Sequence, residues 1–201
     1  MRNKIIQAML DEEYLTTANT MPFFGLNKDV RAFWCSWENG WAIDPKVFFK
    51  WWVNNQYEKH YVYNIVSDFA KVRKSSKGKL YFHSGLDRAG KKADQIYSPI
   101  DGFISSYKMS HWLGYGVNIE IMNFFEEQEF VYKACHLLFL TDPVINKKIK
   151  AGDMIGGMGN TGHCLTLDLG KWRPVSKAEI ESPICNRGVH LHEMVISRGV
   201  K

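Results

Sequence analysis

The stretch HLHEMVI, residues 190–196, decides the fold class of this chain. In a β-strand successive side chains point to opposite faces. His190 and His192 would therefore share one face, while Leu191 would point to a core. Two imidazoles on one face suit two metal ligands, or one ligand beside a proton-transfer group. The stretch predicts a strand that carries chemistry on one side and packing on the other.

Four other apolar runs after residue 79 share this strand-like composition, and glycine, aspartate and asparagine punctuate the joints between them. The four runs are LYFH (80–83), GFISSY (102–107), VNIEIM (117–122) and FVYKACHLLF (130–139). No long helical pattern follows residue 80. We therefore expect a mainly β fold, built on an antiparallel sheet.

The first 73 residues are rich in aromatic side chains and predict helices instead. Apolar residues between Ile5 and Leu10 follow helical spacing. Asp44 followed by Pro45 is typical of an N-cap and a first helical position. Apolar residues beyond Pro45 continue at roughly helical intervals to about Lys71. A helical N-terminal segment would make the chain α+β overall.

The change of pattern predicts the division of the chain. Residues 1–73 form the helical segment, and the charged residues 74–79 form a linker. Residues 80–201 form the β domain, with an insertion at about 164–188. No internal repeat or low-complexity tract is present.

Charge and apolar runs exclude several classes of protein. The formal net charge of +5 is a mild basic excess without the clustered stripe that marks nucleic-acid binding. The N-terminus has a short apolar run before Asp11, too short for a signal peptide. No run approaches the roughly 18 apolar residues of a membrane span. We expect synthesis in a cytoplasm and, since the four cysteines form no CxxC pair, reduced thiols.

Three further side chains are candidates for the same site as His190 and His192. His83 and Asp87 stand four residues apart directly after a strand, and Gly85 allows the turn that brings both onto one metal. His136 lies within an apolar strand, where a buried imidazole needs hydrogen-bond partners. Taken singly, each of these has a structural explanation. Together, two imidazoles and a carboxylate suit zinc with an open position, and the remaining imidazoles suit proton transfer and oxyanion stabilisation. His60 and His111 are interpreted as surface or packing residues.

Six blocks in order resemble the lysostaphin-like zinc endopeptidases, bacterial and phage enzymes that cut peptides in peptidoglycan. The blocks are YFHSGLD (81–87), IYSPIDGFI (96–104), LGYGVNIEI (113–121), YKACHL (132–137), IKAGDMIGGMGNTG (149–162) and HLHEMVI (190–196). YKACHL is similar to the family's Y-x-H-L strand, with extra sequence between the Tyr and the His. The first 73 residues match nothing in the family.

The resemblance implies a role for each of the five side chains. His83, Asp87 and His192 would bind zinc. His136 and His190 would be catalytic, orienting or deprotonating a water molecule and stabilising the transition state. The implied fold is a central antiparallel sheet whose long loops form a narrow groove.

The spacing before the HLH motif departs from the family. About 27 residues separate Gly162 from His190, whereas the family's T-G segment is usually followed closely by HLH. We expect this insertion to form a loop at the groove mouth and to affect substrate preference. A second metal site involving His163, Cys164 and Cys185, which flank the insertion, is a minor alternative.

The leading hypothesis is a zinc endopeptidase that hydrolyses stem peptides or cross-bridges of peptidoglycan, as a phage lysin or virion-associated enzyme acting at the bacterial cell wall. Residues 1–73 would then attach it to phage tail proteins, or cover the groove as a latency element. The alternative is a non-catalytic structural or binding module on the same fold, such as a tail component. A pure binding module has no physical need for all five polar residues. The bond that is cut is not encoded in these motifs.

Overall fold

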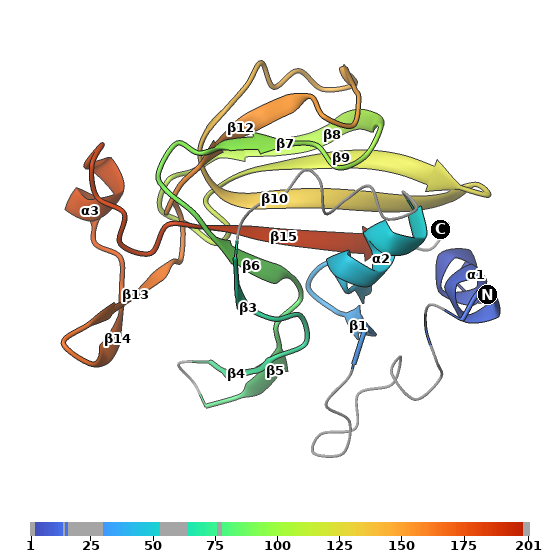
Figure 1. The fold of residues 1–201 in the computed structure, drawn as a ribbon, viewed down its shortest axis with the longest axis horizontal. Helices are drawn as coiled ribbons and strands as arrows, with labels where there is room; N and C mark the ends of the chain where they lie inside the picture. Colours follow the sequence, from blue (N-terminus) through green and yellow to red (C-terminus); the bar gives the residue numbers. More distant parts are fainter. Residues whose placement is uncertain (1–2, 14, 16–29, 53–63, 76–77, 199–201) are drawn as a thin grey trace.

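Strand β10 lies at the centre of the main sheet (Figure 1). The computed structural model describes residues 3–13, 15, 30–52, 64–75 and 78–198. In spatial order the strands of the central path are β1 (Ala32–Cys35), β2 (Gly40–Ile43), β15 (His190–Ser197), β10 (Gln128–Leu140), β9 (Val117–Phe125), β8 (Gly102–Met109) and β11 (Lys148–Ile149).

The other strands join this path from its sides or form separate hairpins. β12 (Met154–Met158) pairs with β10 and with β7 (Gln95–Tyr97), and β6 (Leu86–Ala89) pairs with β15 and with β3 (Ile65–Ser67). The separate hairpins are β4 (Val72–Lys74) with β5 (Leu80–Phe82), and β13 (Leu165–Asp168) with β14 (Lys171–Pro174). Every strand pair within the described residues is antiparallel, which confirms the expected mainly β fold.

Two helices lie in the N-terminal segment, as the apolar spacing predicts. α1 (Lys4–Asp11) begins after Asn3, whose side chain accepts a hydrogen bond from the backbone N–H of Ile6. α2 (Pro45–Trp52) begins at the predicted proline, and the Asp44 carboxylate accepts from the backbone N–H of Lys46. The N-terminal helices are therefore confirmed.

The expected continuation of this helical pattern to Lys71 is wrong. Residues 65–67 form β3, in which Ile65 pairs with Arg88 of β6. Residues 32–35 and 40–43 also form strands rather than helix. Backbone partners far away in sequence stabilise these short strands, and local spacing does not report such partners. Residues 53–63, where part of the predicted helix falls, lie outside the described residues.

The described part of the N-terminal segment packs into the same core as the β domain. β2 pairs with β15 through Ile43 and Val195. Ile43, Phe48 and Phe49 are fully buried in the main hydrophobic cluster. The predicted linker also lies within a hairpin, because the backbone N–H of Ser75 bonds to the carbonyl of Lys79 at 2.8 Å.

Strand β15 separates two faces of the sheet. Leu191 and Val195 join the main hydrophobic cluster on one face. Met194 and Ile196 join a second cluster on the other face. Since side chains alternate along a strand, His190 and His192 share the face of Met194. The two histidines thus lie on the face of the sheet opposite the main core.

A β-bulge in β10 turns His136 onto that same face. Ala134 pairs with Ile119 and Leu137 pairs with Val117, so Cys135 and His136 together oppose one residue of β9. Ala134 and Leu137 both lie in the main cluster. With strict alternation His136 would follow Ala134 into that cluster. Its backbone φ of 61° lies in the left-handed region, which is uncommon for a residue with a side chain.

The insertion before the HLH motif forms β13, β14 and α3 (Lys177–Glu181), which project to one side of the sheet at the left of Figure 1. Ser176 and Glu179 form a capping box at the start of α3. None of the helices in the described residues is both long and apolar enough to cross a membrane.

Candidate metal centre

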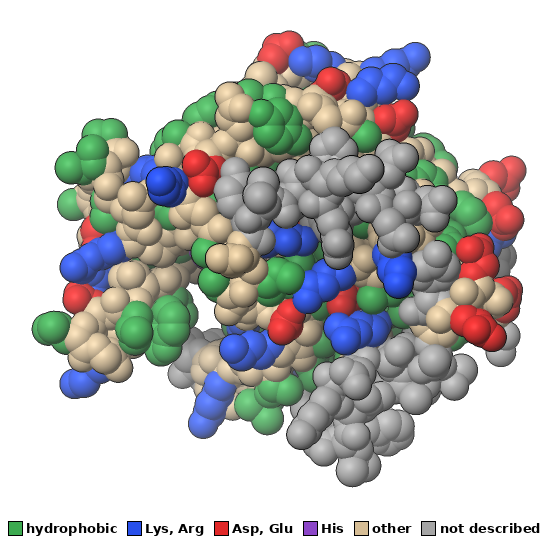
Figure 2. Space-filling model, viewed as in Figure 1, with side chains coloured by type: hydrophobic (Ala, Val, Ile, Leu, Met, Phe, Trp, Pro, Cys, Tyr) green, Lys and Arg blue, Asp and Glu red, His purple; other side chains and the backbone are tan. Residues whose placement is uncertain are grey.

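His83, Asp87 and His192 place three ligand atoms at one point. Asp87 in β6 and His192 in β15 are directly paired across two antiparallel strands, and His83 follows β5. His192 Nδ1 lies 2.8 Å from Asp87 Oδ1, and His83 Nε2 lies 3.0 Å from His192 Nδ1. His83 Nε2 lies 3.1 Å from Asp87 Oδ1. The three side chains are buried. No histidine is visible on the face drawn in Figure 2.

This triangle fits a zinc ion. Tetrahedral zinc with bonds of about 2.0–2.1 Å holds its nitrogen and oxygen ligands about 3.3 Å apart. The observed separations of 2.8, 3.0 and 3.1 Å need to expand by only a few tenths of an ångström. Two imidazoles and one carboxylate are also a donor set typical of catalytic zinc. Both the geometry and the chemistry of these residues suit the metal.

Backbone and charged groups orient two of the three ligands. His83 Nδ1 donates to the carbonyl of Asp68 at 2.9 Å, because a carbonyl accepts only. A neutral His83 therefore presents the lone pair of Nε2 to the metal position. Arg73 donates to Asp87 Oδ2 at 2.5 Å, which leaves Oδ1 facing the two histidines. Asp68 and Arg73 both belong to the N-terminal segment, which supports the ligands here.

The third ligand is held by packing. The ring of Tyr115 stacks on His192, with centroids 5.7 Å apart and an interplanar angle of 10°. Among the described residues His192 Nε2 has no hydrogen-bond partner. Trp37, in the turn between β1 and β2, donates from Nε1 to the Tyr115 hydroxyl at 3.1 Å. The stack fixes the ring plane so that Nδ1 faces Asp87.

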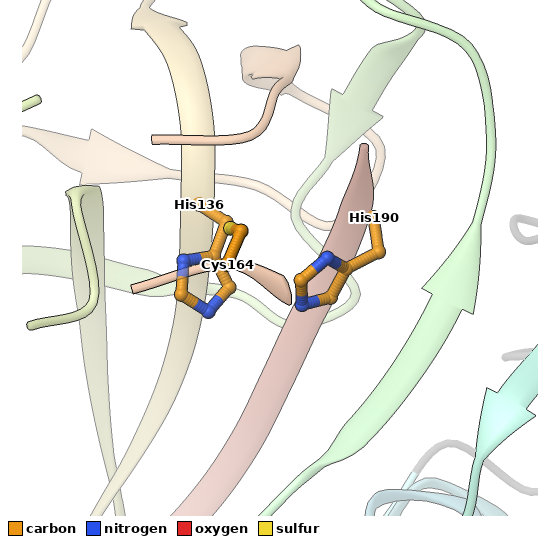
Figure 3. Close-up of side chains that lie close together, drawn as sticks. All are labelled: His136, Cys164 and His190. Atoms are coloured by element: carbon orange, nitrogen blue, oxygen red, sulfur yellow. The ribbon is translucent and has the colours of Figure 1, made fainter. Parts of the chain in front are cut away.

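His136 and His190 form a second pair beside this triangle (Figure 3). Their ring centroids lie 4.7 Å apart. His136 Nδ1 donates to the carbonyl of Thr161 at 2.7 Å, and His190 Nδ1 donates to that of Gly188 at 2.9 Å. When neutral, each ring keeps a lone pair on Nε2. His190 Nε2 lies 3.8 Å from Asp87 Oδ1, so the pair adjoins the metal position.

Burial and charge set the protonation states of this cluster. Burial alone raises the pKa of the Asp87 carboxyl, but hydrogen bonds with His192 and His83 outweigh it and hold that pKa well below its usual range. Burial lowers the pKa of His192 to about 4, against the opposing effect of Asp87. Burial, with the nearby His190 and His192, also lowers the pKa of His136 well below its ordinary value. At neutral pH the site thus holds the Asp87 carboxylate with neutral His136 and His192 rings, the protonation states that metal ligands and bases need.

The structure brings all five predicted side chains together at one place. His111 and His163 take no part in either group of candidate ligands among the described residues, and His60 lies outside them. Sequence reasoning missed Arg73 and Tyr115. Neither carries a local signal, because each acts on a ligand brought near by long-range pairing.

The alternative metal site at the insertion is not assembled as expected. Cys164 joins His136 and His190 in a group of candidate ligands, and neither His163 nor Cys185 belongs to it. Cys164 is 1% exposed, and its thiol donates to the Thr161 carbonyl at 3.3 Å. In the described residues all four cysteines are free thiols, as expected.

No protein-family model matches this sequence, and no curated protein matches it. The fold is similar to several solved peptidases. A mutant catalytic domain of the prophage-encoded M23 protein EnpA from Enterococcus faecalis is 20% identical with a TM-score of 0.47, and the match covers 69% of this chain and 83% of that one. A zinc-containing peptidase from Vibrio cholerae is 23% identical with a TM-score of 0.49, covering 69% of this chain and 35% of that one.

The catalytic domain of the antimicrobial peptidase lysostaphin from Staphylococcus simulans is 18% identical with a TM-score of 0.48, and the match covers 75% of this chain and 87% of that one. Each of these TM-scores is below 0.5.

Proposed function

We propose that this chain is a lysostaphin-type zinc endopeptidase that hydrolyses peptide bonds of peptidoglycan. One observation carries the proposal: three ligand atoms lie within 3.1 Å of one another, beside two further imidazoles with free lone pairs. The order of the six sequence motifs resembles that of peptidoglycan endopeptidases and so suggests peptidoglycan as the substrate class. A bond within a stem peptide or a cross-bridge is the expected target.

His83, Asp87 and His192 would hold the zinc ion through Nε2, Oδ1 and Nδ1. When bound, zinc supplies Lewis acidity toward water and toward a peptide carbonyl. Asp87 contributes the negative charge that lowers the net charge of the centre, and Arg73 holds its second oxygen. His83 is kept in one tautomer by the Asp68 carbonyl.

His136 and His190 would move the protons of the reaction. Each has its Nδ1–H engaged by a backbone carbonyl, so only Nε2 is available to accept a proton. The imidazole that accepts it becomes a cation, which donates from Nε2 and stabilises negative charge on the substrate oxygen. The low pKa of His136 keeps this residue neutral before the reaction begins.

A purely structural role explains this site poorly. Asp87 and three histidines share a largely buried region, and gathering such polar groups away from water costs stability. Apolar residues of similar volume would stabilise the fold better at these positions. We therefore rank the non-catalytic module below the enzyme.

We expect action at the bacterial cell wall as a phage lysin or virion-associated enzyme, with phage tail proteins as candidate partners of residues 1–73. A latency role for that segment is less consistent with the described contacts, because Asp68 and Arg73 orient ligands.

The test is cleavage of a panel of peptidoglycans with different cross-links, with zinc and with chelator, followed by mass spectrometry of the fragments. New amino termini that vanish with chelator are expected, and their masses name the bond. His192→Ala should lose zinc, whereas His136→Asn should keep zinc and lose turnover. His163→Asn, at an exposed position, is the matched control. A zinc-loaded protein that cleaves none of the panel would refute the proposal, and a His136→Asn variant without zinc would refute the division of roles.

A further inference from the structure

Cys164 lies beside the two histidines that the proposed reaction uses. It precedes β13, at the point where the chain leaves the site for the insertion. One ligand atom each of His136, Cys164 and His190 lies within 4.8 Å of the other two. In Figure 3 the rings of His136 and His190 lie side by side, and Cys164 overlaps His136 in this view. This thiol has no part in the proposed chemistry.

Backbone carbonyls orient all three side chains. Both histidines direct Nδ1 at backbone carbonyls, of Thr161 and Gly188, so both have Nε2 available. The Cys164 thiol donates to the Thr161 carbonyl, the same oxygen that His136 uses. One carbonyl thus positions two of the three side chains. Two imidazoles and a thiolate suit Zn²⁺ and its softer relative Cd²⁺.

This set is expected to bind an ion less tightly than the first. The first set already holds its ligand atoms 2.8–3.1 Å apart and includes a carboxylate, close to the roughly 3.3 Å spacing of tetrahedral zinc. The Cys164 thiol instead keeps its proton, which it donates to the Thr161 carbonyl at 3.3 Å, and must lose it before a metal binds. The second set would therefore fill after the first.

We propose that His136, Cys164 and His190 bind a second divalent ion, Zn²⁺ or Cd²⁺, and that this ion inhibits the enzyme. The inhibition rests on the proposed function. A histidine whose Nε2 is bonded to a metal has no lone pair for a proton, so both proton-transfer groups are lost together. The insertion, which brings Cys164 to the site, thereby makes activity sensitive to excess metal.

Binding at this site requires loss of the thiol proton. Burial raises the pKa of the Cys164 thiol, so the free protein holds it protonated. As the metal–sulfur bond forms, the S–H bond breaks and the proton leaves to solvent. The thiolate then offsets one of the two positive charges of the ion.

Cobalt titration of the full chain, freed of metal, tests the proposal. Co²⁺ bound to a thiolate shows a near-ultraviolet charge-transfer band that Co²⁺ on nitrogen and oxygen does not. The first equivalent should bind without this band, and the second should produce it. Cys164→Ser should lose the band, and Cys185→Ser, which changes a thiol outside the set, should retain it. A second equivalent without the band, or a band that persists in Cys164→Ser, would overturn the site.

Two further measurements keep the test decisive. If Cys164→Ser does not fold, His190→Ala, which retains all four thiols, must lose the second equivalent. In the wild type, activity on peptidoglycan should fall in proportion to filling of the second site by zinc. Activity that holds or rises as the site fills would overturn the inhibition. A cobalt band in a protein that cleaves no substrate would support the metal site and refute the peptidase function, so the two failures are distinguishable.

Discussion

Acidification from pH 7 to pH 5 is predicted to destabilise the metal-free protein through two buried imidazoles. Burial lowers the pKa of His192 to about 4, and burial with two neighbouring histidines lowers that of His136 well below its ordinary value. In the unfolded chain both rings titrate near about 6.5. The unfolded state therefore binds two protons that the folded state excludes. Stability is fully present above about pH 6.5 and is lost as the pH falls toward the folded pKa values.

The magnitude follows from these two groups. Each ring lowers the free energy of unfolding by about 2 kcal/mol between pH 7 and pH 5, so the pair lowers it by about 4 kcal/mol. That is a large share of the roughly 5–15 kcal/mol that stabilises a typical domain. Asp87 adds nothing in this range, because its lowered pKa affects stability only below the ordinary carboxyl range.

Urea unfolding at pH 7, 6 and 5 in the presence of chelator, followed by tryptophan fluorescence, measures this loss. His136→Asn should lose about half of the pH-dependent change, about 2 kcal/mol. Asparagine suits the test because it tolerates the left-handed backbone at this position. His163→Asn removes an exposed ring and should leave the pH dependence unchanged. An equal loss from pH 7 to pH 5 in His136→Asn and wild type would refute the reasoning.

Three substitutions test the remaining contacts. Arg73→Ala should weaken zinc binding by roughly tenfold or more in chelator competition, because Asp87 loses its orienting hydrogen bond. Removing the positive charge of Arg73 would by itself favour zinc, but this charge is partly exposed and screened, so its effect is small. An unchanged or higher affinity would contradict the prediction. Gly85→Ala should lower the zinc affinity measured in the same assay, since a Cβ there would lie 2.6 Å from Cε1 of His192. Full zinc content in this variant would count against the close packing of this turn on His192. Ile43→Ala should lower the free energy of unfolding by about 2–5 kcal/mol, because this residue is fully buried where the N-terminal segment joins the sheet. A change near zero in urea unfolding would show that the segment is dispensable for the stability of the sheet.

Local patterns were sufficient to predict much of the sheet and to single out the five candidate side chains. The alternation in HLHEMVI predicts that His190 and His192 share a face, and the structure places them there because a strand has a strict period of two. Asp44 and Pro45 mark the start of α2 for an equally local reason, the capping of free backbone groups.

Tertiary structure decided everything that depends on partners distant in sequence. The strand β2 joins β15, and Asp68 and Arg73 reach the ligands, through contacts that no local spacing encodes. The bulge that turns His136 out of the core depends on its pairing with β9. Cys164 reaches the histidines only because the insertion begins and ends at the site. A sequence pattern reports the period of one element, whereas these features arise where separate elements meet.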